Sequence, residues 1–183
     1  MRKTIGRIGL NVAAMLLLSG MAFGSDPGGA VQEKVLEKAP AFDVVTMKGE
    51  PASLEKLLSL NEAVLLNFWG LRCGACIQEM PYLNQLYSRY KGKVAFLGVN
   101  ADGADAALLR SKVGKGPLQI EYEIVPDPEL KLIDLFKMTA APLTIIIDRK
   151  RDIRYRHENF EDGDEVRIEQ ALKDCLVEET RAK

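Results

Sequence analysis

The sequence predicts an α/β fold in which a central β-sheet is covered by helices on both faces. Its 183 residues are 47% hydrophobic and 28% charged, an ordinary composition for one globular domain. Residues 63–69 and 143–147 are almost wholly apolar, as strands buried on both faces of a sheet are. Amphipathic segments alternate with these apolar runs, and that alternation is typical of α/β proteins.

The N-terminal segment is expected to serve export and not to belong to the domain. Three basic residues precede an apolar run over residues 8–23, and small residues around Gly24 fit a signal peptidase site. Retention of residues 1–24 as a membrane anchor stays open, and only then would the protein contact a membrane. Residues 25–38 are expected to be a flexible leader before a domain over residues 39–183. We therefore expect a periplasmic or other extracytoplasmic location.

The elements of the domain follow from local patterns. Ser53 can cap a helix over 54–60, because its hydroxyl can accept a hydrogen bond from the first turn. Apolar residues recur on one side of residues 73–90 and of 165–178, which predicts amphipathic helices. The remaining predictions are strands over 42–45, 94–99 and 153–157, helices over 104–112 and 130–136, and a solvated acidic loop over 158–165.

Charge and cysteine content narrow the function. Removing residues 1–24 takes away three of the 25 basic residues and none of the 26 acidic ones, which leaves 22 against 26 and a net charge of −4. Nucleic acid is therefore not expected as a partner, because phosphate binding needs a positive surface. Three cysteines are too few for a scaffold built on disulfides.

The chemical signal is the pair Cys73 and Cys76, four residues after a buried strand and at the start of a helix. Free N–H groups and the helix dipole at that position favour the thiolate, the reactive form of cysteine. Spacing of three on a helix lets the two sulfurs form a disulfide. We expect Cys73 to attack a substrate disulfide and Cys76 to resolve the mixed disulfide.

Other uses of a CxxC pair fit less well. A zinc site needs about four ligands, and only His157 and Cys175 remain to supply them. Haem attachment requires a His directly after the second Cys, where this chain has Ile77. A structural disulfide stays open. Cys175 is expected to be a buried inert thiol and His157 to be structural or solvated.

Two separated motifs carry a family resemblance. Residues 67–81, which read NFWGLRCGACIQEMP, resemble the active-site segment of the TlpA/ResA/CcmG group of thioredoxin-like proteins, and residues 139–148, TAAPLTIIID, are similar to its cis-proline strand. Residues 39–42 followed by Gly49 look like its N-terminal β-hairpin. The resemblance covers roughly residues 39–176, and it implies a thioredoxin-like fold with a mixed sheet and an N-terminal hairpin extension.

The resemblance also implies roles for two further residues. Pro142 would follow a cis peptide bond and face the cysteines, which leaves the preceding backbone free to pair with a substrate strand. Glu79 matches a glutamate that helps proton transfer, and a partly buried carboxylate with a raised pKa could take the proton from Cys76. An exposed helix glutamate is the alternative for Glu79, and an ordinary trans proline is the alternative for Pro142.

Several positions depart from the family pattern or adjust the site. Arg72 stands where the family usually has Trp, and it could stabilise the Cys73 thiolate, steer acidic partners or be solvated. Gly74 and Ala75 lie between the cysteines and tune the redox potential, with Ala75 in place of the usual Pro. Asn67 replaces the buried Asp of classical thioredoxins, so a relay would rest on Glu79 or water. Trp69 is expected to pack beside the site.

The function expected is therefore an exported thiol–disulfide oxidoreductase that reduces protein disulfides, with cytochrome c maturation as one setting that the family implies. Its partners would be a disulfide-bearing protein and an upstream thiol donor embedded in the membrane. No metal or cofactor beyond the redox-active disulfide is expected. Alternatives are a peroxiredoxin, a Sco-like copper-binding protein and a non-catalytic adaptor. Gly70 stands where a peroxiredoxin has Thr, and the chain lacks the CxxxC and His of Sco-like proteins.

Overall fold

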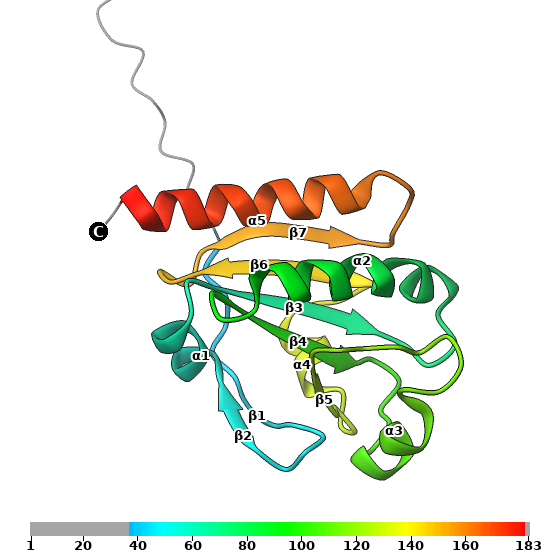
Figure 1. Ribbon diagram of the computed structural model, residues 1–183. Helices are drawn as coiled ribbons and strands as arrows, with labels where there is room; N and C mark the ends of the chain where they lie inside the picture. Colours follow the sequence, from blue (N-terminus) through cyan, green and yellow to red (C-terminus); the bar gives the residue numbers. More distant parts are fainter. Residues whose placement is uncertain (1–36, 182–183) are drawn as a thin grey trace, which may run out of the picture. The chain divides into compact units, whose positions relative to one another are not determined.

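The computed structural model describes residues 37–181 and contains a five-stranded mixed sheet with helices on both faces (Figure 1). This confirms the predicted α/β fold class. Across the sheet the strands are, in spatial order, β5 (Glu123–Val125), β4 (Val94–Asn100), β3 (Ala63–Trp69), β6 (Leu143–Asp148) and β7 (Ile153–Glu158). β5, β4 and β3 are parallel, whereas β6 and β7 are antiparallel to their neighbours.

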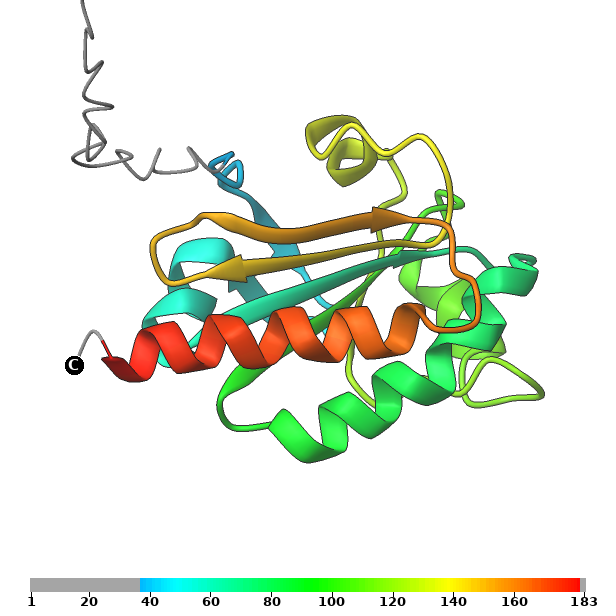
Figure 2. The ribbon, with the colours of Figure 1, turned by 90° about the horizontal axis from the view of Figure 1, so that it is seen from above.

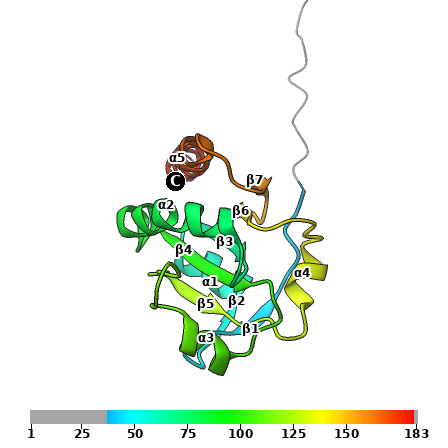
Figure 3. The ribbon, with the colours of Figure 1, turned by 90° about the vertical axis from the view of Figure 1, so that its right-hand side faces the viewer.

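The sheet separates two apolar layers. Val64, Leu66 and Phe68 of β3 belong to the layer under helices α1 (Leu54–Leu60) and α4 (Lys131–Leu135). Ala63 and Leu65 belong to the opposite layer, against α2 (Gly74–Tyr90) and α5 (Asp164–Arg181). Figure 2 shows α5 running beside α2, and in Figure 3 these two helices lie on the other side of the sheet from α4.

An N-terminal hairpin extends the domain, as the family resemblance implied. Strands β1 (Asp43–Val45) and β2 (Pro51–Ser53) pair antiparallel in a separate two-stranded sheet. The N–H of Met47, in the connection between them, donates to the carbonyl of Ile124 at 2.7 Å and so ties the hairpin to β5. Ser53 caps α1 as predicted, since its hydroxyl accepts from the Lys56 N–H at 3.2 Å.

The sequence patterns missed one strand, placed the start of one helix too early and misjudged the burial of one loop. β5 was not predicted, because three residues before Pro126 are too few to show a period, and only pairing with β4 makes them a strand. The predicted helix over 104–112 begins later, as α3 (Ala106–Lys112), because Asp105 caps it. The predicted solvated loop over 158–165 is correct only in part: residues 159 and 161–163 are exposed, whereas Phe160 and Asp164 are buried.

The predicted signal, residues 1–24, and most of the predicted leader lie outside the described residues. Within the described part, the N–H of Ile153 donates to the Glu37 carbonyl at 2.8 Å, and Lys38 forms a β-bridge with Asp152. Ordered pairing therefore already includes Glu37, two residues before the predicted start of the domain. None of the helices between residues 37 and 181 is both long enough and apolar enough to span a bilayer.

Candidate active site

The two cysteines of the CxxC motif form a disulfide at the start of α2, as predicted. Cys73 is the N-cap residue of the helix, and its sulfur accepts a hydrogen bond from the Cys76 N–H at 3.1 Å. Cys76 is only 1% exposed, whereas Cys73 is partly exposed. Of the two sulfurs, that of Cys73 is therefore the one within reach of a second molecule.

The loop between β3 and the disulfide is held by Asp102, which follows β4. The Asp102 carboxylate accepts a hydrogen bond from the Leu71 N–H, and Asn100 fixes Asp102 in turn by accepting from its N–H at 3.2 Å. A side chain at Gly70 would crowd this carboxylate, because a Cβ at that position would lie 3.0 Å from Asp102 Oδ1. No local sequence pattern marks Asp102, because its partner is a backbone group 31 residues away.

A groove of about 420 Å³ lies beside Cys73. The peptide bond between Ala141 and Pro142 is cis, and Pro142 is buried directly after Ala141, which lines the groove. The segment before it is anchored, because the N–H and hydroxyl of Thr139 both donate to the Glu158 carboxylate. The groove is lined by Gly70, Arg72, Cys73, Ala101, Asp102, Ile133, Met138, Thr139, Ala140 and Ala141.

Glu79 lies one helical turn after Cys76 and is more deeply buried than expected, at 1% exposure. Its carboxylate accepts hydrogen bonds from the Thr144 hydroxyl at 2.6 Å and from the Asn67 amide at 2.7 Å. Burial raises the pKa of Glu79 to about 7, although both hydrogen bonds oppose the rise because they stabilise the anion. This carboxyl is therefore able to take or release a proton near neutral pH.

Strands β3 and β6 bring the two hydrogen-bond partners of Glu79 together, and the segment before β5 adds Tyr122. Asn67 on β3 stands directly opposite Thr144 on β6 and beside Gly98 on β4. Tyr122 lies next to β5, and its hydroxyl donates to Asn67 Oδ1 at 3.3 Å. Burial raises the pKa of Tyr122 well above its usual value, so this hydroxyl stays protonated. A Cβ on Gly98 would lie 3.0 Å from the Tyr122 ring, so a glycine is what lets this ring reach Asn67.

Thr144 and Tyr122, like Asp102, are site residues that were not predicted from the sequence. Thr144 lies two residues after Pro142 within a run of apolar side chains, and a lone hydroxyl in such a strand is the signal that was available. Nothing local marks Tyr122, which is 55 residues from its partner Asn67.

The predicted tuning residues take different positions. Trp69 is fully buried beside Cys76 and Met80, and its Nε1 has no hydrogen-bond partner. Arg72 is exposed and lines the groove, and Gly74 is the exposed first residue of α2. Ala75 is partly buried. The proposed effects of Arg72, Gly74 and Ala75 on the cysteines stay predictions.

The remaining cysteine and the histidine lie apart from the disulfide. Cys175 is buried on α5 with Ile168 and Leu172 and takes no part in the disulfide. His157 Nε2 lies 3.1 Å from the buried Asp164 carboxylate, a contact between the end of β7 and the start of α5. Within residues 37–181, no group of three or more His, Cys, Asp or Glu side chains is arranged to bind a metal.

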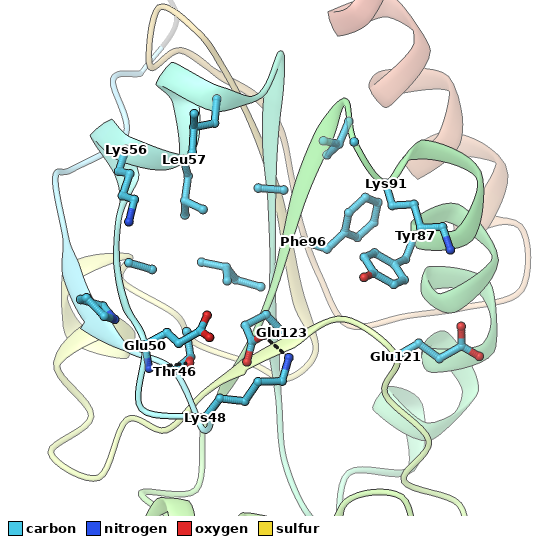
Figure 4. Close-up of a pocket in the computed structure, with 17 residues that line it drawn as sticks. Thr46, Lys48, Glu50, Lys56, Leu57, Tyr87, Lys91, Phe96, Glu121 and Glu123 are labelled. Atoms are coloured by element: carbon cyan, nitrogen blue, oxygen red, sulfur yellow. Dashed lines mark hydrogen bonds and ion pairs between the residues drawn. The ribbon is translucent and has the colours of Figure 1, made fainter.

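A second pocket, of about 340 Å³, lies between the hairpin, α1 and β4 (Figure 4). Lys48 and Glu123 form an ion pair of 2.6 Å at its edge, and the rings of Tyr87 and Phe96 contact each other within it, with centroids 5.6 Å apart. This pocket shares no residue with the groove beside Cys73. It is therefore not part of the redox site.

The strand order and the redox pair at the start of α2 place the protein among the thioredoxin-like thiol–disulfide oxidoreductases. The model of the AhpC/TSA family matches residues 35–156, and the chain belongs to that family. Thiol-disulfide oxidoreductase ResA of Bacillus thuringiensis is 30% identical over 148 residues, covering 78% of this chain and 83% of that protein. The chain is accordingly a thiol–disulfide oxidoreductase of the ResA type.

Solved structures of similar proteins have the same fold. A crystal structure described as a thiol:disulfide interchange protein DsbE, from Chlorobium tepidum, has a TM-score of 0.65 and 26% identity, covering 77% of this chain and 96% of that one. StoA of Bacillus subtilis has the same fold with a TM-score of 0.59 at 18% identity, covering 73% and 97%. The ResA and DsbE relatives favour disulfide exchange over the peroxiredoxin, Sco-like and adaptor alternatives.

Proposed function

We propose that the protein acts as a reductant of disulfide bonds in exported proteins. The observation that carries this proposal is the burial of Glu79 one helical turn after Cys76. A buried carboxylate opposes a second negative charge nearby, so it disfavours the thiolate form of the reduced pair. Strongly oxidising proteins have a high reduction potential because their reduced, dithiol form is stabilised. A site that disfavours the dithiol form therefore has a low reduction potential and acts as a reductant.

The groove supports a protein as the substrate. The backbone of residues 139–141 borders the groove beside Cys73, next to the cis proline. An extended peptide can pair with such a backbone segment and present its own disulfide to the exposed sulfur. Ile133 and Met138 add an apolar wall that can receive a neighbouring side chain.

The reaction proceeds in two exchanges. The Cys73 thiolate attacks one sulfur of the substrate disulfide, which forms a mixed disulfide and releases the first substrate thiol after protonation. Cys76 then gives its proton to Glu79 and attacks Cys73, which releases the second substrate thiol. Two electrons pass to the substrate, and the enzyme is left with the Cys73–Cys76 disulfide. Each substrate sulfur leaves as a thiolate: the first takes a proton from solvent, which received the proton of Cys73 when that thiol ionised, and the second takes the proton that Cys76 gave to Glu79.

A thiol donor must therefore reduce the disulfide again after each turnover. The family resemblance implies a membrane-embedded donor, and the predicted signal over residues 1–24 would bring the domain to the same extracytoplasmic side. Apocytochrome c, which the resemblance also implies, is the first protein substrate to assay.

The test is reduction of insulin by dithiothreitol, followed as turbidity. The wild-type chain should accelerate it, and Cys73→Ser should abolish the acceleration because the attacking sulfur is lost. Cys175→Ala, which removes a thiol far along the chain, should retain the activity and serves as the matched control. No acceleration by the wild type would refute the proposal.

The direction of the reaction is tested by the reduction potential of the pair. Equilibration with glutathione buffers measures it, since about 30 mV corresponds to a tenfold change in the equilibrium constant. We expect a potential at or below that of thioredoxin, about −270 mV. A value near about −120 mV, as in dedicated oxidants, would overturn the assignment as a reductant.

A further inference from the structure

We propose that Glu158 is a positioning residue that fixes the backbone of residues 139–141 for pairing with a peptide, and that it thereby favours protein disulfides over small disulfides as substrates. This inference rests on the proposed function, because it concerns how a protein substrate meets Cys73. Glu158 is the last residue of β7 and does not line the groove beside Cys73. Its effect on a substrate must therefore pass through the segment that it holds.

The segment before the cis proline is not ordered by a helix or strand of its own. Residues 136–142, between the end of α4 and the start of β6, belong to neither kind of element. Lys137 has a φ of 50°, a conformation that residues other than glycine adopt at a cost. Local backbone preference therefore does not hold this segment in place, and contacts with other parts of the chain must do so.

Two side chains of β7 supply these contacts. The Glu158 carboxylate accepts hydrogen bonds from the Thr139 N–H, at 2.9 Å, and from the Thr139 hydroxyl. Arg156 donates to the Lys137 carbonyl at 3.1 Å and to Glu158 Oε1 at 3.2 Å. The arginine therefore links the carboxylate to the first part of the segment, and the carboxylate holds the middle.

Glu158 is suited to this role because it stays ionised at neutral pH. Burial alone would raise its pKa, but the hydrogen bonds from Thr139 and the Ala140 N–H and the positive charge of Arg156 outweigh burial, so that the pKa is lowered. Hydrogen bonds to an ionised carboxylate are stronger than those between neutral groups. The carboxylate can therefore hold two successive backbone N–H groups.

The same contacts leave the groups that a peptide needs. Within residues 37–181, the Ala141 N–H and the carbonyls of residues 139–141 make no hydrogen bond, and Ala141 lines the groove together with Cys73. A peptide that pairs with a backbone already fixed does not lose affinity to the ordering of that backbone. A small disulfide can reach the exposed sulfur of Cys73 without pairing with the segment, so it gains nothing from Glu158.

The test compares two second-order rate constants of the reduced full chain, one with insulin and one with hydroxyethyl disulfide, which is small and uncharged. Glu158→Ala should lower the ratio of the insulin rate to the small-disulfide rate by roughly tenfold, because binding must then order about one backbone residue. Glu161→Ala removes an exposed carboxylate from the following loop and should keep the wild-type ratio. An unchanged ratio in Glu158→Ala would overturn the inference. An equal fall of both rates would overturn it too, because the site would then be distorted for every substrate.

Thr139→Val provides a second test that leaves Glu158 in place, for the case that Glu158→Ala does not fold. This variant loses the hydroxyl donor and keeps the N–H donor, so the ratio should fall by a smaller factor, roughly threefold. Thr139→Ser keeps the hydroxyl and should restore the wild-type ratio. The same ratio in both Thr139 variants would contradict the role of the carboxylate.

The wild type separates this inference from the proposed function. A wild-type chain that reacts with hydroxyethyl disulfide but not with insulin would refute the proposed function, and the inference with it. A wild-type chain that reduces insulin, with a ratio that Glu158→Ala leaves unchanged, would refute the inference alone.

Discussion

The burial of Glu79 makes the stability of the oxidised protein depend on pH. Its pKa rises from 4.5 in a model compound to about 7 in the folded chain, so the folded state binds the proton more tightly than the unfolded state does. The contribution of Glu79 to stability is then greatest below about pH 4.5, falls as the pH rises toward 7 and is flat above it. Each pH unit is worth about 1.4 kcal/mol, which gives a loss of about 3 kcal/mol across this window.

Glu79→Gln should remove this loss, because glutamine stays neutral at every pH. The measurement is the free energy of unfolding in urea at pH values from 4.5 to 8, for wild type and variant, with the disulfide kept oxidised. The comparison concerns the slope against pH, since glutamine changes the hydrogen bonds as well as the charge. Glu55→Gln, at an exposed position of α1, should keep the wild-type slope. If the wild type and Glu79→Gln had the same slope, the argument from burial would be refuted.

Three further substitutions test the packing that supports the site. Leu83→Ala removes a fully buried side chain between α2 and the sheet, and should cost about 2–5 kcal/mol in urea unfolding; a loss below about 1 kcal/mol would contradict the assigned burial. Gly98→Ala places a methyl group 3.0 Å from the Tyr122 ring and 3.1 Å from Trp69 Nε1, so it should cost about 1–3 kcal/mol and shift the tryptophan fluorescence; an unchanged spectrum would show that the rings are not fixed. Asp105→Ala removes the N-cap of α3 and should cost about 1 kcal/mol by thermal unfolding, whereas Asp105→Ser should recover most of it; equal losses would deny the cap.

Local pattern was enough wherever the interaction is between near neighbours in the chain. The buried strand β3 shows as an apolar run, and the position of Cys73 follows from a strand that ends four residues before it. Helix caps such as Ser53 are also local, since the hydroxyl and its N–H partner are three residues apart. β5 shows the limit, because three residues have no period of their own and become a strand only by pairing with β4.

Longer-range pairing decided the environment of Glu79. Sequence resemblance implied a carboxylate that moves protons, but its partners come from β3, β6 and the segment before β5. Thr144 is 65 residues from Glu79, and Tyr122 is 55 residues from Asn67. The sequence pattern of a single helix or strand cannot indicate contacts between residues so far apart in the chain.

The sequence by itself determined the chemistry of this protein: two cysteines one helical turn apart, at the end of a buried strand, with a proline-containing strand to face them. The tertiary structure alone decided how the chemistry is controlled. Strand register places Asn67 opposite Thr144. The absence of a side chain at Gly98 leaves room for the ring of Tyr122. The physical reason is that the chemical type of a reactive group is a property of its own residue and can be read from the sequence. Its pKa depends on the loss of solvent and the gain of hydrogen-bond donors when distant segments pack around it.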